Sequence, residues 1–168
     1  LYLTVDDRVS VFTYEFKVIK TSYSALSNTW DHELFTEILI AKKRQGALVR
    51  LVVDGEMMRT SPSYWQSTRV IDMIDAGIAI HAWYSDKGKY ARMHAKTNIF
   101  DDATVLTGSA NITKNGFSDS GNNEHAFRIR NPDVVMKMVE EFEKVWIESL
   151  PLLPVLILIL RNKVHSKE

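Results

Sequence analysis

The sequence contains no cysteine. This absence excludes disulfide bonds, thiolate zinc sites and cysteine nucleophiles together. It leaves the compartment open, because secreted proteins of this size can also fold without disulfides. The chain begins at Leu1 rather than at a methionine. We interpret this as a boundary within a longer protein or the loss of an N-terminal leader, and we expect a water-soluble chain with export as one option.

An excess of either charge is also missing. The 21 basic and 21 acidic residues give a formal net charge of zero. A protein that binds nucleic acid by bulk electrostatic attraction usually carries a net positive charge. Any site for a polyanion on this chain must therefore be a local patch.

No hydrophobic run is long enough to span a bilayer. The nearest candidate, residues 150–160, has about half of the roughly 20 apolar residues that a spanning helix needs. We interpret it as a terminal segment packed on this domain or on a partner. Contact with a membrane surface is the less favoured alternative. The length of 168 residues favours one domain, assigned to residues 1–149 and followed by an apolar and then charged tail over 150–168.

Strand and helix patterns alternate along the chain. Strands are predicted at residues 9–16, 47–54, 78–84, 93–100, 103–107 and 124–129. Helices are predicted to begin at Asp31, Ser61-Pro62 and Asn131-Pro132, and the first two to end near Gly46 and Gly77. This order predicts an α/β fold with a mixed, partly parallel β-sheet flanked by helices on both faces. Active sites of such sheets lie outside the strand ends.

Polar residues that could take part in catalysis follow in the second half of the chain. Residues two apart in a strand face the same way, so His94 and Lys96 are predicted to project together. The ammonium group attracts a phosphate and stabilises charge on its oxygens, while the imidazole can act as nucleophile or proton carrier. Gly108, Ser109 and Asn111 end a predicted strand with groups that donate hydrogen bonds to phosphate oxygens without charge repulsion.

Two acidic residues complete the set. Glu124 begins the last predicted strand and is placed to accept a hydrogen bond from the other ring nitrogen of His94, which would set the tautomer. Asp101 lies on the turn between two predicted strands, and we expect its role to be structural. A His-X-Lys pair alone is common on protein surfaces, so the signal comes from the ordered set.

That ordered set resembles the signature of the phospholipase D superfamily: His-X-Lys, four residues, Asp, six residues, Gly-Ser, and Asn one residue later. Every position is filled here, from His94 to Asn111, with the spacing intact. Larger members of the superfamily carry two copies of the motif. A chain of this length with one copy resembles the short bacterial and archaeal endonuclease-like members, which are homodimers. The resemblance implies a two-fold axis that brings both copies of His94 to one site.

The resemblance also implies a mechanism. One His94 attacks phosphorus to form a phosphohistidine, and the other protonates the leaving oxygen. Lys96 and Asn111 hold the non-bridging oxygens, Ser109 adds a hydrogen bond at the edge of the site, and Glu124 orients the imidazole. No metal or cofactor is implied, because two lysines supply the positive charge.

We expect a nucleic-acid substrate, DNA with RNA left open. Basic residues that flank the motif predict a local rim, although a solvated loop fits equally well: Lys87, Lys89, Arg92 and Lys114. Aromatic residues could stack on bases, although core packing is the favoured interpretation: Tyr64, Trp65, Tyr84 and Tyr90. One alternative is a phospholipid phosphodiesterase with the apolar tail at a membrane. The other is a silent nucleic-acid-binding module of a larger protein, against which the complete motif argues.

Overall fold

The computed structural model describes residues 8–13, 32–55, 64–86, 93–110 and 121–152. The strands of this part are β1 (Arg8–Thr13), β2 (Leu48–Asp54), β3 (Ala79–Trp83), β4 (Lys96–Phe100), β5 (Thr104–Gly108), β6 (Ala126–Ile129) and β7 (Leu150–Pro151). The helices are α1 (His32–Arg44), α3 (Tyr64–Asp75) and α5 (Pro132–Glu148). The predicted starts at Asp31 and Ser61-Pro62 lie outside the described residues.

All the described strands form one sheet in the order β6-β5-β4-β1-β2-β3-β7. The three central strands β1, β2 and β3 are parallel to one another. β4, β5 and β6 follow as antiparallel neighbours on one side, and β7 is antiparallel to β3 on the other. The prediction of a mixed, partly parallel sheet is therefore confirmed.

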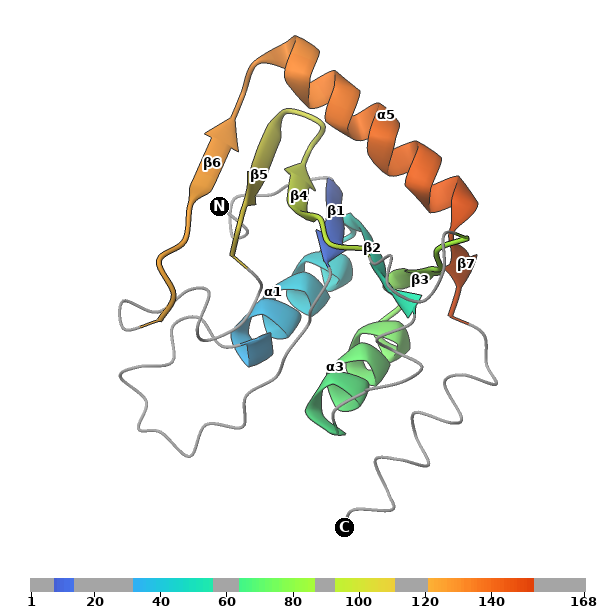
Figure 1. The fold of residues 1–168 in the computed structure, drawn as a ribbon. Helices are drawn as coiled ribbons and strands as arrows, with labels where there is room; N and C mark the ends of the chain where they lie inside the picture. The colour runs from blue at the N-terminus through green and yellow to red at the C-terminus, as the bar shows by residue number, and fades with distance from the viewer. Residues whose placement is uncertain (1–7, 14–31, 56–63, 87–92, 111–120, 153–168) are drawn as a thin grey trace.

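Helices cover both faces of the sheet, as predicted (Figure 1). Alternate residues of β2 face opposite sides, so Leu51 and Val53 pack in the cluster that contains Leu39 of α1 and Met73 of α3. Val52 belongs instead to the cluster that contains buried residues of α5. The nearly continuous apolar run of β2 thus reflects a strand buried on both faces.

The ends of the helices follow the expected local chemistry. Gly46 and Gly77 adopt positive φ values of 99° and 83° just after α1 and α3, a conformation that glycine reaches without steric cost. Asn131 caps α5, where its side-chain oxygen accepts from the N–H groups of Asp133 and Val134, and Pro132 occupies the first helical turn.

A stacked polar and aromatic cluster fastens α5 to the sheet. Arg50 of β2 donates to both carboxylate oxygens of Glu143, with Nη1 at 3.0 Å from Oε2. Its guanidinium lies 4.8 Å from the ring centre of Phe142 and 5.1 Å from that of Trp146. His81 of β3 stacks on Trp146 with ring centres 3.6 Å apart. Partial burial is the main cause that lowers the pKa of His81, and the positive charge of Arg50 adds to it.

The beginning of the apolar tail packs on this domain. Leu150–Pro151 pair with β3 as β7, and the N–H of Leu152 donates to the carbonyl of Ile80 at 3.1 Å. Leu152 is buried in the same cluster as α1 and α3. Residues 153–168 of the predicted tail lie outside the described part. Among the helices that the structure describes, none has both the length and the hydropathy to cross a membrane.

Candidate active site

The sheet topology brings the motif to one edge of the sheet. The parallel strand β2 ends there at Asp54, and β1 ends beside it at Thr13. β4 runs the opposite way, so its first residue, Lys96, pairs with Thr13. Thr97 pairs with Thr107 on β5, which therefore ends at the same edge. Residues far apart in the sequence thus meet at the carboxyl ends of the central strands, where α/β sheets place their sites.

The predicted pair of His94 and Lys96 is brought together. Lys96 Nζ lies 3.3 Å from Nδ1 and 3.5 Å from Nε2 of the His94 ring. The lone pair of an imidazole nitrogen lies in the ring plane, so an ammonium group nearly equidistant from both nitrogens donates well to neither. Its firm hydrogen bond goes to the His94 carbonyl oxygen at 2.8 Å. His94 is exposed and Lys96 half-buried, so a substrate can reach both.

A second polar cluster forms where β5 ends and the segment before β6 begins. Glu124 accepts hydrogen bonds from the Ser109 hydroxyl and from Asn122 Nδ2, the latter at 3.1 Å. These two bonds are the main causes that lower the pKa of Glu124, and the nearby charges of Lys96 and His125 act in the same direction. Glu124 is therefore a stable anion on the Lys96 side of the site.

The contacts of this cluster bear on the roles expected of Glu124 and Ser109. Glu124 was predicted to accept from His94, and in this structure its carboxylate oxygens accept from Ser109 and Asn122. Ser109 was predicted to donate to the substrate, but its one proton goes to Glu124 while its oxygen accepts from the N–H of His125 at 3.0 Å. A hydroxyl has a single donor. Ser109 therefore joins β5 to Glu124, and Glu124 lies just before β6 rather than at its start.

Gly108 is required by the closeness of two backbones. A Cβ at this position would lie 1.9 Å from the carbonyl oxygen of His125. The contact is paired with a hydrogen bond of 3.0 Å from the N–H of Ser109 to the same oxygen. Sequence reasoning placed Gly108 in the motif without assigning it this role. The glycine next to a strand end was the available signal.

Asp101, for which a structural role was predicted, is part of a tight turn. Asp101 and Asp102 have φ values of 53° and 49°, and the N–H of Ala103 donates to the carbonyl of Phe100 at 3.0 Å. Positive φ at both central positions is the requirement of a type I′ turn, and aspartate tolerates it better than most residues. The predicted hairpin joined at these two residues is confirmed.

Asp54 was not identified from the sequence. Its side chain is 2% exposed, and Oδ2 accepts from the backbone N–H of Met93 at 2.8 Å. Met93 directly precedes His94. An aspartate at the end of an apolar strand near a turn is an ordinary pattern, so nothing in the sequence connected it to the histidine.

Several predicted residues cannot be placed. Asn111 and the predicted basic rim lie outside the described residues: Lys87, Lys89, Arg92 and Lys114. Tyr90 also lies outside them, and the side chains of Tyr64 and Trp65 are not described. Tyr84 is 40% exposed, with its ring so close to Gly55 that a Cβ there would meet it at 2.6 Å.

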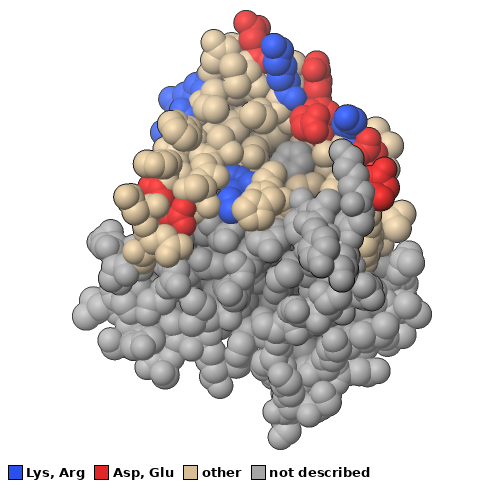
Figure 2. Space-filling view, viewed as in Figure 1, with Lys and Arg blue, Asp and Glu red and all other residues tan. Residues whose placement is uncertain are grey.

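The described residues on the face drawn in Figure 2 show no concentration of one charge. Figure 2 shows acidic and basic side chains interspersed along α5, consistent with the zero net charge of the whole chain. Within the described ranges, no group of three or more His, Asp or Glu side chains is arranged to hold a metal ion.

The fold is that of solved phospholipase D family structures. The phospholipase D family member Nuc from Salmonella typhimurium superposes with a TM-score of 0.69 at 21% identity, over 89% of this chain and 84% of Nuc. NucT from Helicobacter pylori superposes with a TM-score of 0.65 at 17% identity, over 89% of this chain and 85% of NucT.

The chain belongs to the phospholipase D-like family. A family model described as the PLD-like domain of cardiolipin synthase matches residues 7–146, which confirms the resemblance that the motif indicated. The chain is also 27% identical over 111 residues to a mitochondrial cardiolipin hydrolase from Chlamydomonas reinhardtii. The match covers 66% of this chain and only 45% of that relative.

Proposed function

We propose that this protein hydrolyses phosphodiester bonds through His94, with nucleic acid as its substrate. The observation that carries the proposal is the exposed His94 ring with the Lys96 ammonium group 3.3 Å from it. An imidazole can form a bond to phosphorus, and a cation beside it lowers the cost of bringing a nucleophile to an anionic diester.

The proposed reaction has two steps. His94 attacks phosphorus, and the bond from phosphorus to the leaving oxygen breaks as a proton is delivered to that oxygen. Water then attacks the phosphohistidine, gives up a proton, and releases the phosphate monoester with His94 restored. Lys96 stabilises the charge on the non-bridging oxygens in both steps, so the mechanism asks for no metal. Asn111 is proposed to share this role.

The reaction needs a second group besides the attacking imidazole, which gives a proton to the leaving oxygen and then takes the proton that water gives up; we propose that the partner subunit's His94 is this group. An isologous dimer places equivalent residues around one two-fold axis, so a single histidine per chain supplies both the nucleophile and the acid. The exposure of His94 and its position at the carboxyl ends of the parallel strands support this arrangement.

Glu124 and Ser109 support the site without contacting the reacting atoms in this proposal. The lowered pKa of Glu124 keeps it ionised near neutral pH, and its negative charge acts on the Lys96 ammonium group. Ser109 holds Glu124 to the end of β5. Glu124→Gln should therefore cost less activity than loss of His94 or Lys96.

Cleavage assays in excess EDTA test the proposal. Single-stranded DNA, duplex DNA, RNA and cardiolipin-containing vesicles are offered in parallel to wild type, His94→Ala and Lys96→Ala. We expect DNA cleavage that persists in the chelator, falls to background in His94→Ala and drops on the order of 100- to 1,000-fold in Lys96→Ala. Lys144→Ala, an exposed lysine on α5, is the matched control and should behave as wild type.

Three other outcomes would change or refute parts of the proposal. Cleavage of the vesicle lipid alone would replace nucleic acid by phospholipid as the substrate, a class that the name of the Chlamydomonas relative makes relevant. Activity of His94→Ala near that of wild type would refute the histidine mechanism. Sedimentation as a monomer during active turnover would refute the shared site.

A further inference from the structure

We infer that Asp54 is a positioning residue that fixes the nucleophile through the backbone of Met93. The inference rests on the proposed function for its effect on catalysis, and on the geometry alone for the hydrogen bond. Asp54 lies at the carboxyl end of β2, the strand with neighbours on both sides in the sheet and buried residues on both faces.

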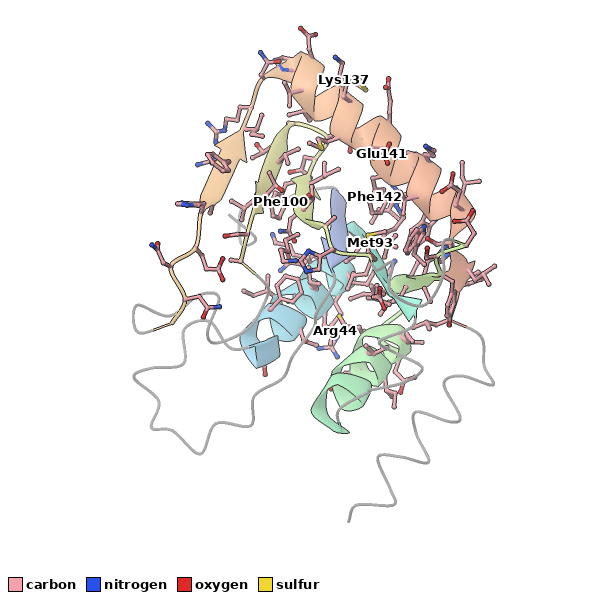
Figure 3. All side chains as sticks on the ribbon, in the orientation of Figure 1. Arg44, Met93, Phe100, Lys137, Glu141 and Phe142 are labelled. Carbon is pink, nitrogen blue, oxygen red and sulfur yellow. The ribbon has the colours of Figure 1, made fainter. Side chains whose placement is uncertain are left out.

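Met93 is fixed at two points. Its N–H donates to Asp54 Oδ2 at 2.8 Å, and its side chain is 8% exposed in the cluster shared with Val52 and Phe142. Figure 3 shows Met93 and Phe142 between the sheet and α5. His94 is the next residue and is itself exposed.

The hydrogen bond matters because His94 precedes the sheet. β4 begins at Lys96, so residues 93–95 come before the strand and are not part of it. The bond from Met93 to Asp54 supplies an anchor one residue before His94, and pairing of Lys96 with Thr13 supplies one two residues after it. An imidazole between two such anchors keeps its place beside the Lys96 ammonium group.

The acceptor for the Met93 N–H is a buried side-chain oxygen. A buried polar group is costly unless it is hydrogen-bonded, so a buried acceptor and its donor hold each other in a stiff arrangement. A site that needs the nucleophile in place within a fraction of an ångström gains from that stiffness, since a misplacement of about 1 Å can cost on the order of 100-fold in rate.

Three variants test the inference. Asp54→Asn keeps an oxygen acceptor for Met93, Asp54→Leu keeps the branched shape without an acceptor, and Thr36→Val is the matched control. Thr36 is a fully buried polar residue of α1 whose hydroxyl has no partner among the described contacts. We expect kcat to fall on the order of 100-fold in Asp54→Leu with KM within about three-fold. Asp54→Asn should recover kcat to within about ten-fold of wild type, and Thr36→Val should match wild type.

Amide hydrogen exchange at Met93 provides a measurement that does not depend on activity. The Met93 N–H should be protected in wild type and Asp54→Asn and should exchange faster in Asp54→Leu, while amides of β2 and β3 stay protected. An unprotected Met93 amide in wild type would overturn the inference even if Asp54→Leu failed to fold. Equal kcat in Asp54→Leu and Thr36→Val would overturn it as well.

The two proposals fail in different ways. If wild type cleaved no phosphodiester, or if His94→Ala retained wild-type activity, the proposed function would fail while the exchange result still decided whether Asp54 holds Met93. If His94→Ala were inactive but Asp54→Leu kept wild-type kcat, the function would stand and the positioning role would be wrong.

Discussion

Replacement of Gly108 by alanine tests how the site is held together. The added Cβ would lie 1.9 Å from the carbonyl oxygen of His125, whereas real Cβ atoms essentially never approach closer than 3.0 Å. The two backbones must therefore separate by roughly 1 Å, because the contact is with main-chain atoms that cannot rotate away. The end of β5 would move away from the segment that carries Glu124.

The expected cost follows from the bonds that the separation breaks. Ser109 and His125 exchange two hydrogen bonds, each 3.0 Å long, N–H to carbonyl and N–H to hydroxyl. At about 1 kcal/mol for each bond, Gly108→Ala should lower the free energy of unfolding by about 2 kcal/mol. A shift of about 1 Å at the site should also reduce kcat/KM on the order of 100-fold.

Urea unfolding and steady-state cleavage measure the two effects. Gly46→Ala is the control, because Gly46 has a positive φ of 99° with no atom within 4 Å of an added Cβ and precedes the opposite end of β2. It should cost about 1 kcal/mol of stability and leave kcat/KM unchanged. A Gly108→Ala protein as stable and active as wild type would refute the argument from close approach.

Three further predictions concern the turn between β4 and β5, the ionised Glu124, and the packing of His81 on α5. Asp102→Val should destabilise the protein by about 1–2 kcal/mol in thermal melts, while Asp102→Gly should cost nothing; equal melting temperatures would contradict the positive φ. Ser109→Ala removes the main cause of the low pKa of Glu124. Activity that needs ionised Glu124 is present above pH 4.5, the ordinary pKa of this group, and is lost as the pH falls through the lowered pKa. In Ser109→Ala the loss of activity should therefore begin at a higher pH. An unchanged acid limb in the pH profile of kcat/KM would refute this prediction. The unfolded chain binds a proton at His81 more readily than the folded one, so stability should fall as pH drops below 6.5. His81→Phe keeps a ring against Trp146 and should reduce this dependence of stability on pH, measured by urea unfolding at several pH values. An unaltered dependence would contradict the prediction that His81 causes it.

Much of the fold could be predicted because local chemistry and periodicity agreed along the chain. The buried run that became β2, the glycines after α1 and α3, and the cap at Asn131 each depend on neighbours within a few residues. The turn at Asp101 and Asp102 is of the same kind. The ordered motif from His94 to Asn111 likewise indicated the family, because its spacing is a property of the sequence alone.

Only the tertiary structure decided which polar groups bind one another. Glu124 accepts from Ser109, since pairing between β5 and β6 brings the end of one strand against the segment before the other. The role of Gly108 follows from the same approach of two backbones. Asp54 and Met93 are 39 positions apart, and no periodicity connects them. The sequence determined the elements and the chemical groups, whereas strand order and register determined their contacts, because those depend on long-range packing of the whole sheet.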